Sequence, residues 1–135
     1  IAIPDLLGGR VTMMFDNMPS SLPLVREGKL RGLAVTSAKR VAAAPDIPTI
    51  AESGLPGFEA VSWFSLVAPA KLPKEIQQRL NQLSLQTLSK PEIRAKLMGG
   101  GLEPNPGTPE ELARYIQQES TKWRKIVQQS GAKAE

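Results

Sequence analysis

Short runs of apolar residues alternate with turn-forming residues through the first half of the chain. Runs of this kind, bounded by Gly, Pro, Asn and Ser, are typical of strands covered on both faces. They predict strands at Val11–Phe15, Gly32–Thr36 and Ala60–Ala68. Helical spacing precedes the first run, at Pro4–Leu7, and follows it, at Ser20–Glu27. Because helices alternate with strands, we expect an α/β fold in which the strands pair largely in parallel.

After Pro69 the apolar positions recur at the spacing of helices. The pattern predicts helices at Lys74–Leu88 and Pro91–Met98, and a third that begins after a capping threonine, Thr108, and ends at Gly131. The apolar stripes are Ile76, Leu80, Leu83 and Thr87 in the first helix, and Leu112, Ile116, Trp123, Ile126 and Val127 in the last. The sequence supplies little sheet to bury these stripes, so we expect them to pack on another chain or on a further part of the same chain.

The stretch Lys39–Glu59 is irregular and rich in proline and glycine. Within it, Thr49 and Glu52 have the spacing of a capping box, which predicts a helix of little more than one turn that ends at Gly54. Arg40 stands near the beginning of this stretch. Its guanidinium could pair with a ligand carboxylate, but a solvated surface arginine is the simpler interpretation.

The first predicted strand runs into a polar turn that holds Asp16, Asn17, Ser20 and Ser21. In open α/β sheets, ligands bind at the carboxyl ends of strands, and the first N–H groups of the following helix favour an anion there. The alternative is purely local: Asn17 or Ser20 caps the helix and Asp16 lies well against its dipole. The residues alone leave both interpretations open.

Trp63 and Phe64 lie on the third predicted strand. A large aromatic side chain at this place could form one wall of a ligand site between two halves of the molecule. It could equally pack in a core, where aromatic residues are common.

Composition excludes several classes of chemistry. The 135 residues contain neither histidine nor cysteine, so Ser-His-Asp and Cys-His catalysis, disulfides and a common type of zinc site are excluded within this chain. Gly99–Gly101 lacks the Lys-Ser/Thr of a phosphate-binding loop and is expected to end a helix. The basic cluster Lys122–Lys125 surrounds a tryptophan on the apolar stripe, so nucleic-acid binding is not predicted. We therefore expect no enzyme activity, no cofactor and no metal.

The chain also lacks the sequence signals of membrane insertion. No stretch reaches the roughly 18 apolar residues that a membrane span needs. The opening residues, IAIPDLLGGR, have no charged segment followed by a long apolar segment and a small-residue cleavage site, so we expect no signal peptide in this chain.

Several segments together resemble one protein family. These are DLLGG before the first predicted strand, FDN after it, GKLRGLAVTS, PDIPTIAESG, and the strand that contains WF and ends in AP. In this combination they resemble the later part of the Bug receptors, the extracytoplasmic solute-binding proteins of tripartite tricarboxylate transporters. The resemblance covers nearly the whole chain.

The resemblance implies a partial fold of the type II periplasmic-binding-protein kind, with two α/β lobes that close on a small carboxylate. It places residues 1–58 in the later part of the second lobe, 59–68 in a strand that crosses between the lobes, and 69–135 in helices that return to the first lobe. It implies ligand contacts from the strand-end and helix-start positions and from one aromatic residue near the crossing. Those positions are Phe15, Asp16, Asn17, Ser20, Ser21 and Trp63.

The resemblance further implies a periplasmic protein that delivers a dicarboxylate, tricarboxylate or acidic amino acid to membrane transporter subunits. The alternative is a structural or oligomerising domain without a small ligand, in which the exposed stripes bind a second copy. For this chain alone we expect pairing of two copies, including a domain-swapped form in which helices of one copy cover the sheet of the other.

Overall fold

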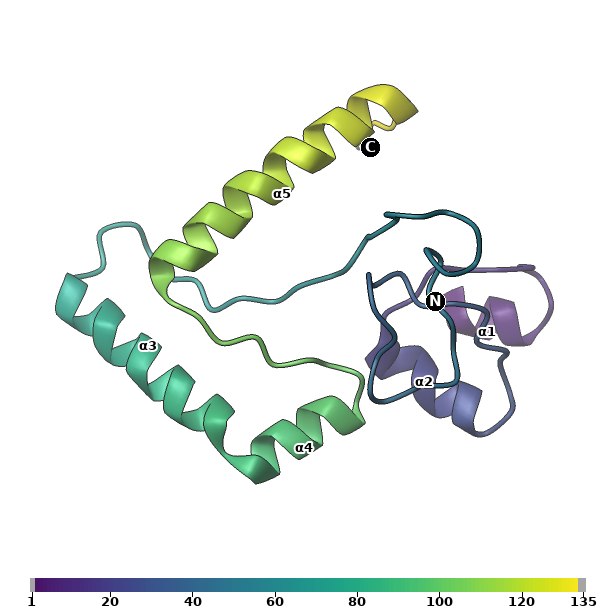
Figure 1. Ribbon diagram of the computed structural model, residues 1–135, viewed down its shortest axis with the longest axis horizontal. Helices are drawn as coiled ribbons and strands as arrows, with labels where there is room; N and C mark the ends of the chain where they lie inside the picture. Colours follow the sequence, from purple (N-terminus) through teal and green to yellow (C-terminus); the bar gives the residue numbers. More distant parts are fainter. Residues whose placement is uncertain (1, 134–135) are drawn as a thin grey trace. The chain divides into compact units, whose positions relative to one another are not determined.

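The structure is a computed structural model that describes residues 2–133, and its regular structure is helical (Figure 1). The helices are α1 (Ala2–Leu7), α2 (Met18–Arg26), α3 (Lys74–Ser89), α4 (Pro91–Gly99) and α5 (Pro109–Ser130). The chain forms two compact units. The first unit runs to Pro69 and includes Lys90–Pro104, and the second comprises Ala70–Ser89 and the residues from Asn105 onward. The expected boundaries after residues 58 and 68 separate the parts of a two-lobed receptor. These boundaries stay a prediction.

The helices lie where the apolar spacing predicts them. Two helices begin two residues earlier than expected: α1 at Ala2 rather than Pro4, and α2 at Met18 rather than Ser20. Proline is favoured in the first turn of a helix, because its missing N–H has no intrahelical partner there in any case. Pro19 therefore belongs to the first turn of α2 and does not precede it. The helix ends as expected, with Gly28 just beyond it at φ 69°.

The predicted strands at Val11–Phe15, Gly32–Thr36 and Ala60–Ala68 are wrong for the described residues. Residues 60–68 run extended (Figure 1), but none of the three segments forms a strand. Within residues 2–133 the β pairing consists of one isolated parallel bridge between Val35 and Thr49. A strand is defined by a ladder of hydrogen bonds to a neighbouring strand. Within the described part of the chain, these three segments form no such ladder.

Thr49 and Glu52 confirm the capping box but not the helix. The Glu52 N–H donates to Thr49 Oγ1 at 3.0 Å, and the Thr49 N–H donates to Glu52 Oε2 at 2.8 Å. The following residues form hydrogen-bonded turns, with the Ser53 N–H donating to the Thr49 carbonyl at 3.1 Å. Gly54 follows at φ 120°, a conformation that suits glycine and ends the turn.

The first unit has a small core. Leu22 of α2 is 3% exposed, and Val35, Ala44 and Thr49 are also buried. Thr49 is the most deeply buried of the four, at 1%. Its side-chain oxygen is satisfied by the Glu52 N–H, so its burial leaves no unpaired polar atom. This core joins α2 to the bridge between Val35 and Thr49.

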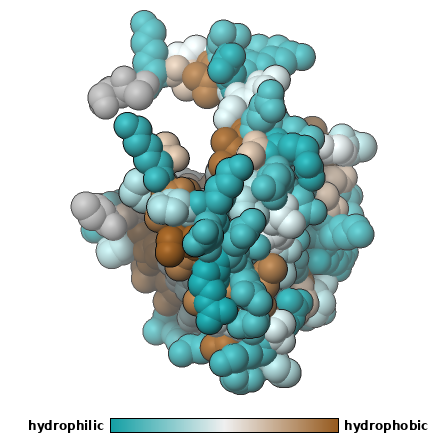
Figure 2. Space-filling model, turned by 90° about the vertical axis from the view of Figure 1, so that its left-hand side faces the viewer, coloured by the Kyte–Doolittle hydropathy of each residue, from teal (hydrophilic) through white to brown (hydrophobic). Residues whose placement is uncertain are grey.

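The second unit contains α3 and α5, and its apolar stripes reach the surface. Ile76, Leu80, Leu83, Ile116, Trp123, Ile126 and Val127 are all exposed. Hydrophobic side chains are visible among the polar ones on the face drawn in Figure 2. Packing within the second unit therefore leaves these stripes partly exposed.

Local interactions alone define both ends of α5. The Glu111 N–H donates to Thr108 Oγ1 at 3.1 Å, while the Thr108 N–H donates to Glu111 Oε2 at 2.7 Å. Gly131 ends the helix in the left-handed conformation, at φ 67°. The predicted capping threonine and closing glycine are both confirmed.

Candidate functional site

The polar turn before α2 is organised by one serine hydroxyl. Ser20 Oγ lies 2.8 Å from Asp16 Oδ2 and 2.8 Å from the Asn17 carbonyl oxygen. A hydroxyl has one proton, so these two acceptors share it. The carboxylate of Asp16 is thereby attached to the first turn of the helix. This contact supports the local interpretation, in which Asp16 orients the turn.

The Asn17 carbonyl collects the remaining donors of the turn. It accepts from the Ser20 and Ser21 N–H groups at 3.1 and 3.3 Å and from the Ser21 hydroxyl at 3.2 Å. Asn17 is the N-cap residue by its backbone, at φ −75° and ψ 137°, but its side chain makes no capping hydrogen bond. The exposed Asn17 amide is therefore not committed to the helix end, and it can both donate to and accept from a ligand.

Two of the predicted site residues present aromatic surface. Phe15 immediately precedes the turn and is 72% exposed, and Trp63 on the later extended segment is 39% exposed. Neither side chain belongs to the small buried core of the first unit. Hydrogen bonds join the four polar residues of the turn to one another, whereas Trp63 lies on a separate segment. Ligand contact by these six residues remains a prediction.

Arg40 has a structural partner. Its Nε donates to Glu52 Oε2 at 2.9 Å, and its Nη1 donates to the Pro45 carbonyl at 3.1 Å. The Thr49 N–H and the Arg40 guanidinium hold the pKa of Glu52 below its usual value of 4.5. This pairing supports the interpretation of Arg40 as a surface residue that braces the irregular stretch.

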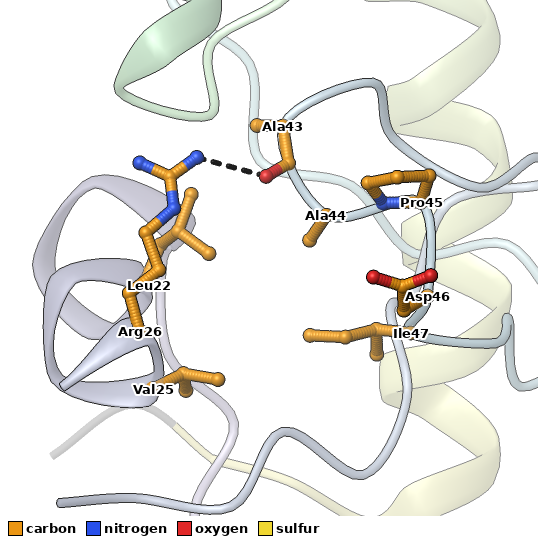
Figure 3. A pocket seen from close by; sticks show the side chains of 8 residues that line it. All are labelled: Leu22, Val25, Arg26, Ala43, Ala44, Pro45, Asp46 and Ile47. Atoms are coloured by element: carbon orange, nitrogen blue, oxygen red, sulfur yellow. Dashed lines mark hydrogen bonds between the residues drawn. The ribbon is translucent and has the colours of Figure 1, made fainter. Parts of the chain in front are cut away.

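A hollow of about 280 Å³ lies between α2 and the loop that connects the bridge residues Val35 and Thr49 (Figure 3). Its walls are mainly aliphatic, with a guanidinium and a carboxylate among them. The lining residues are Leu22, Val25, Arg26, Ala43, Ala44, Pro45, Asp46 and Ile47. The sequence does not reveal this hollow, because its two walls are far apart along the chain and the loop shows no periodic pattern.

Two negative findings apply to residues 2–133. No group of three or more acidic side chains there is arranged to hold a metal ion. None of the helices in that range is both long enough and apolar enough to cross a membrane.

Comparison with known proteins identifies the family. Residues 1–132 match the family model described as the tripartite tricarboxylate transporter family receptor. Protein BugT of Bordetella pertussis is 36% identical over 132 residues, which is 98% of this chain and 40% of that protein. The chain thus spans less than half the length of this curated relative.

Solved structures give the same result. R. palustris Rpa4515 with adipate superposes with a TM-score of 0.89 at 40% identity, over 96% of this chain and 43% of that chain. MatC (Rpa3494) from Rhodopseudomonas palustris with bound malate gives 0.82 at 34% identity, over 93% and 44%. The periplasmic binding protein BugD gives 0.87 at 32% identity, over 99% and 46%.

These matches confirm the resemblance to the Bug receptors. The structural neighbours are periplasmic binding proteins, so the chain corresponds to part of an α/β receptor fold, although its described residues are largely helical. The homologues are solute-binding receptors rather than enzymes. The chain belongs to the receptor family of the tripartite tricarboxylate transporters.

Proposed function

We propose that this chain is the later part of a periplasmic receptor that captures a small carboxylate and delivers it to membrane transporter subunits. The observation that carries the proposal is the superposition on Rpa4515 with adipate, at a TM-score of 0.89 and 40% identity. MatC with bound malate supports the same ligand class. A dicarboxylate, a tricarboxylate or an acidic amino acid fits the class.

The proposed contact surface is the turn before α2, with Phe15 and Trp63 as aromatic neighbours. Asp16 carries a negative charge and would repel a ligand carboxylate placed directly against it. The Asn17 amide, by contrast, can donate to a carboxylate oxygen. Because Ser20 and Ser21 direct their hydroxyl protons to Asp16 and Asn17, their oxygens would accept from a ligand hydroxyl or ammonium group, and they would meet a ligand carboxylate through water.

The same proposal accounts for the exposed stripes of the second unit. In a receptor whose ligand lies between two lobes, the remaining part of the protein would cover α3 and α5. The exposed Ile116 and Ile126 also suit the alternative of an oligomerising domain with no small ligand. The receptor is better supported, because the matched proteins are receptors. Pairing of two copies stays a prediction for this chain alone.

The experiment is thermal melting of the receptor-length protein against a panel that includes adipate, malate, citrate and glutamate. A ligand that binds only the folded state stabilises it by about 2.7 kcal/mol at a concentration 100 times its Kd. We expect at least one acid to raise the melting temperature. Asn17→Ala should reduce that increase, while the control Asn105→Ala, at an exposed position of the second unit, should not. An unchanged melting temperature with every acid would contradict the proposal.

A further inference from the structure

Arg26 joins three segments that are distant in the sequence. It lies in the last turn of α2, where its Nη2 donates to the Ala43 carbonyl at 2.9 Å (Figure 3). Its Nη1 donates to the Gly99 carbonyl at 3.3 Å, 73 residues further along the chain. The two bonds come from different nitrogens of the planar guanidinium, whereas a lysine would have to reach both carbonyls from a single ammonium nitrogen. The C-terminal end of α2 is thus attached to the irregular loop and to the end of α4.

The other end of α2 is held by close packing. A Cβ atom added to Gly101 would lie 2.6 Å from Met18 Cβ, the first residue of α2. Such a distance is well inside van der Waals contact. Gly101 also has φ +79°, which glycine adopts without strain. The segment from Gly99 to Gly101 therefore contacts α2 near both of its ends.

From these contacts we infer that Arg26 is a positioning residue for ligand binding. Helix α2 has nine residues and contains Pro23, which removes one hydrogen bond from the helix interior, so contacts at both of its ends are needed to fix where its first turn lies. That first turn carries Asn17, Ser20 and Ser21, the proposed contact surface. Arg26 lies at the opposite end of the helix and acts on the ligand only through the helix. This inference rests on the proposed function.

The expected change in apparent Kd follows from the fraction of molecules in which the turn before α2 has the geometry that binds the ligand. When only a fraction of the molecules holds the binding geometry, the apparent Kd rises by the inverse of that fraction. If loss of the Arg26 contacts leaves about one molecule in ten competent, binding weakens about tenfold. The inference therefore predicts a change of affinity in addition to any change of stability.

The test uses Arg26→Met in the receptor-length protein, which keeps an apolar stem and removes both hydrogen bonds. Binding of adipate and malate is measured by calorimetry, and amide exchange of Ser20 and Ser21 is measured without ligand. We expect about tenfold weaker binding and faster exchange at these two amides. Arg26→Lys should fall between the wild type and Arg26→Met. Arg31→Met, at an exposed arginine outside these contacts, should change neither readout.

A matched pair of glycine variants tests the same inference without touching Arg26. Gly101→Ala introduces the clash with Met18 and a strained φ, whereas nothing lies within 4 Å of an added Cβ at Gly99. We therefore expect Gly101→Ala to speed amide exchange at Ser20 and Ser21 and to weaken binding, and Gly99→Ala to change exchange and binding much less.

The results distinguish failure of the positioning role of Arg26 from failure of the proposed receptor function. If Arg26→Met lowers the melting temperature but leaves ligand affinity and exchange of Ser20 and Ser21 unchanged, Arg26 only stabilises the fold and the inference is wrong. If the wild type binds no organic acid, the proposed function fails. The exchange measurement on ligand-free protein then still decides whether Arg26 holds the turn, because it needs no ligand.

Discussion

Helix α5 has apolar residues at helical spacing and the extended segment Ala60–Ala68 is an apolar run, yet only α5 forms its predicted element. Every hydrogen bond that defines α5 is local, including the capping box at Thr108. A strand needs a neighbour for each backbone group. The extended segment begins with one such contact, from the Ala60 N–H to the Thr36 carbonyl at 2.9 Å, which no ladder continues within residues 2–133. The difference lies in where the hydrogen-bond partners come from: α5 finds them within its own segment, whereas a strand needs a neighbouring strand.

The largest expected effect is the loss of unfolding free energy when a buried side chain of the first unit is truncated, compared with an exposed side chain of the second unit. Leu22→Ala removes a side chain that is 3% exposed from the core of the first unit and should destabilise it by about 2–3 kcal/mol, near the lower limit for buried leucines because it borders the hollow. In an unpaired copy of this chain, Ile126→Ala, at a side chain that is 40% exposed, should cost less than about 1 kcal/mol. Urea unfolding of each variant measures the difference.

The same pair of variants in the receptor-length protein sharpens the comparison. If the rest of the receptor covers α5, Ile126→Ala should become about as costly as Leu22→Ala, at roughly 2 kcal/mol or more. An equally small cost in both lengths of the protein would show that the stripe is not buried in the receptor.

A smaller effect tests the claim that α5 is specified locally. Thr108→Ala removes the capping hydroxyl and should lower stability by about 1 kcal/mol, with loss of helical signal from the first turn. Thr121→Ala is the control, since its hydroxyl donates to the Gln117 carbonyl within the same helix and caps nothing. Circular dichroism during urea unfolding measures both variants. An effect of Thr121→Ala equal to that of Thr108→Ala would contradict the role of the cap.

The smallest effect concerns acid stability in the first unit. The pKa of Glu52 is held below its usual 4.5 by the Thr49 N–H and the Arg40 guanidinium. The folded state therefore binds the Glu52 proton less readily than the unfolded state, so this contribution is present above about pH 4.5 and is lost as the pH falls through the folded pKa. Glu52→Gln should flatten the unfolding free energy between about pH 5 and pH 3. Glu59→Gln, an exposed carboxyl outside these contacts, is the control.

The sequence predicted features that depend on neighbours in the chain. The capping residues Thr49 and Thr108, the closing glycines and the helical stripes are all local signals, and the structure contains each of them. The strand at Val11–Phe15 was mispredicted because an apolar run indicates burial, but it does not supply the partner strand.

In the candidate site, too, the sequence could group only residues that are neighbours in the chain. Asp16, Asn17, Ser20 and Ser21 could be grouped from the sequence because they occupy one turn. Trp63 could be proposed from its aromatic side chain, with core packing as the alternative, but only the family resemblance groups it with that turn, because no local pattern does so. The contacts of Arg26 were missed because its partners, the residue 43 and residue 99 carbonyls, belong to the backbone and lie 17 and 73 residues away. A carbonyl acceptor leaves no signature in the identity of its residue.

The most direct test of the central claim is a crystal structure of the receptor-length protein with adipate or malate bound. The account predicts a ligand carboxylate within about 3 Å of the Asn17 amide, or joined to it by one water molecule, with Phe15 or Trp63 against the ligand. A bound acid that contacts none of Phe15, Asp16, Asn17, Ser20, Ser21 and Trp63 would contradict it.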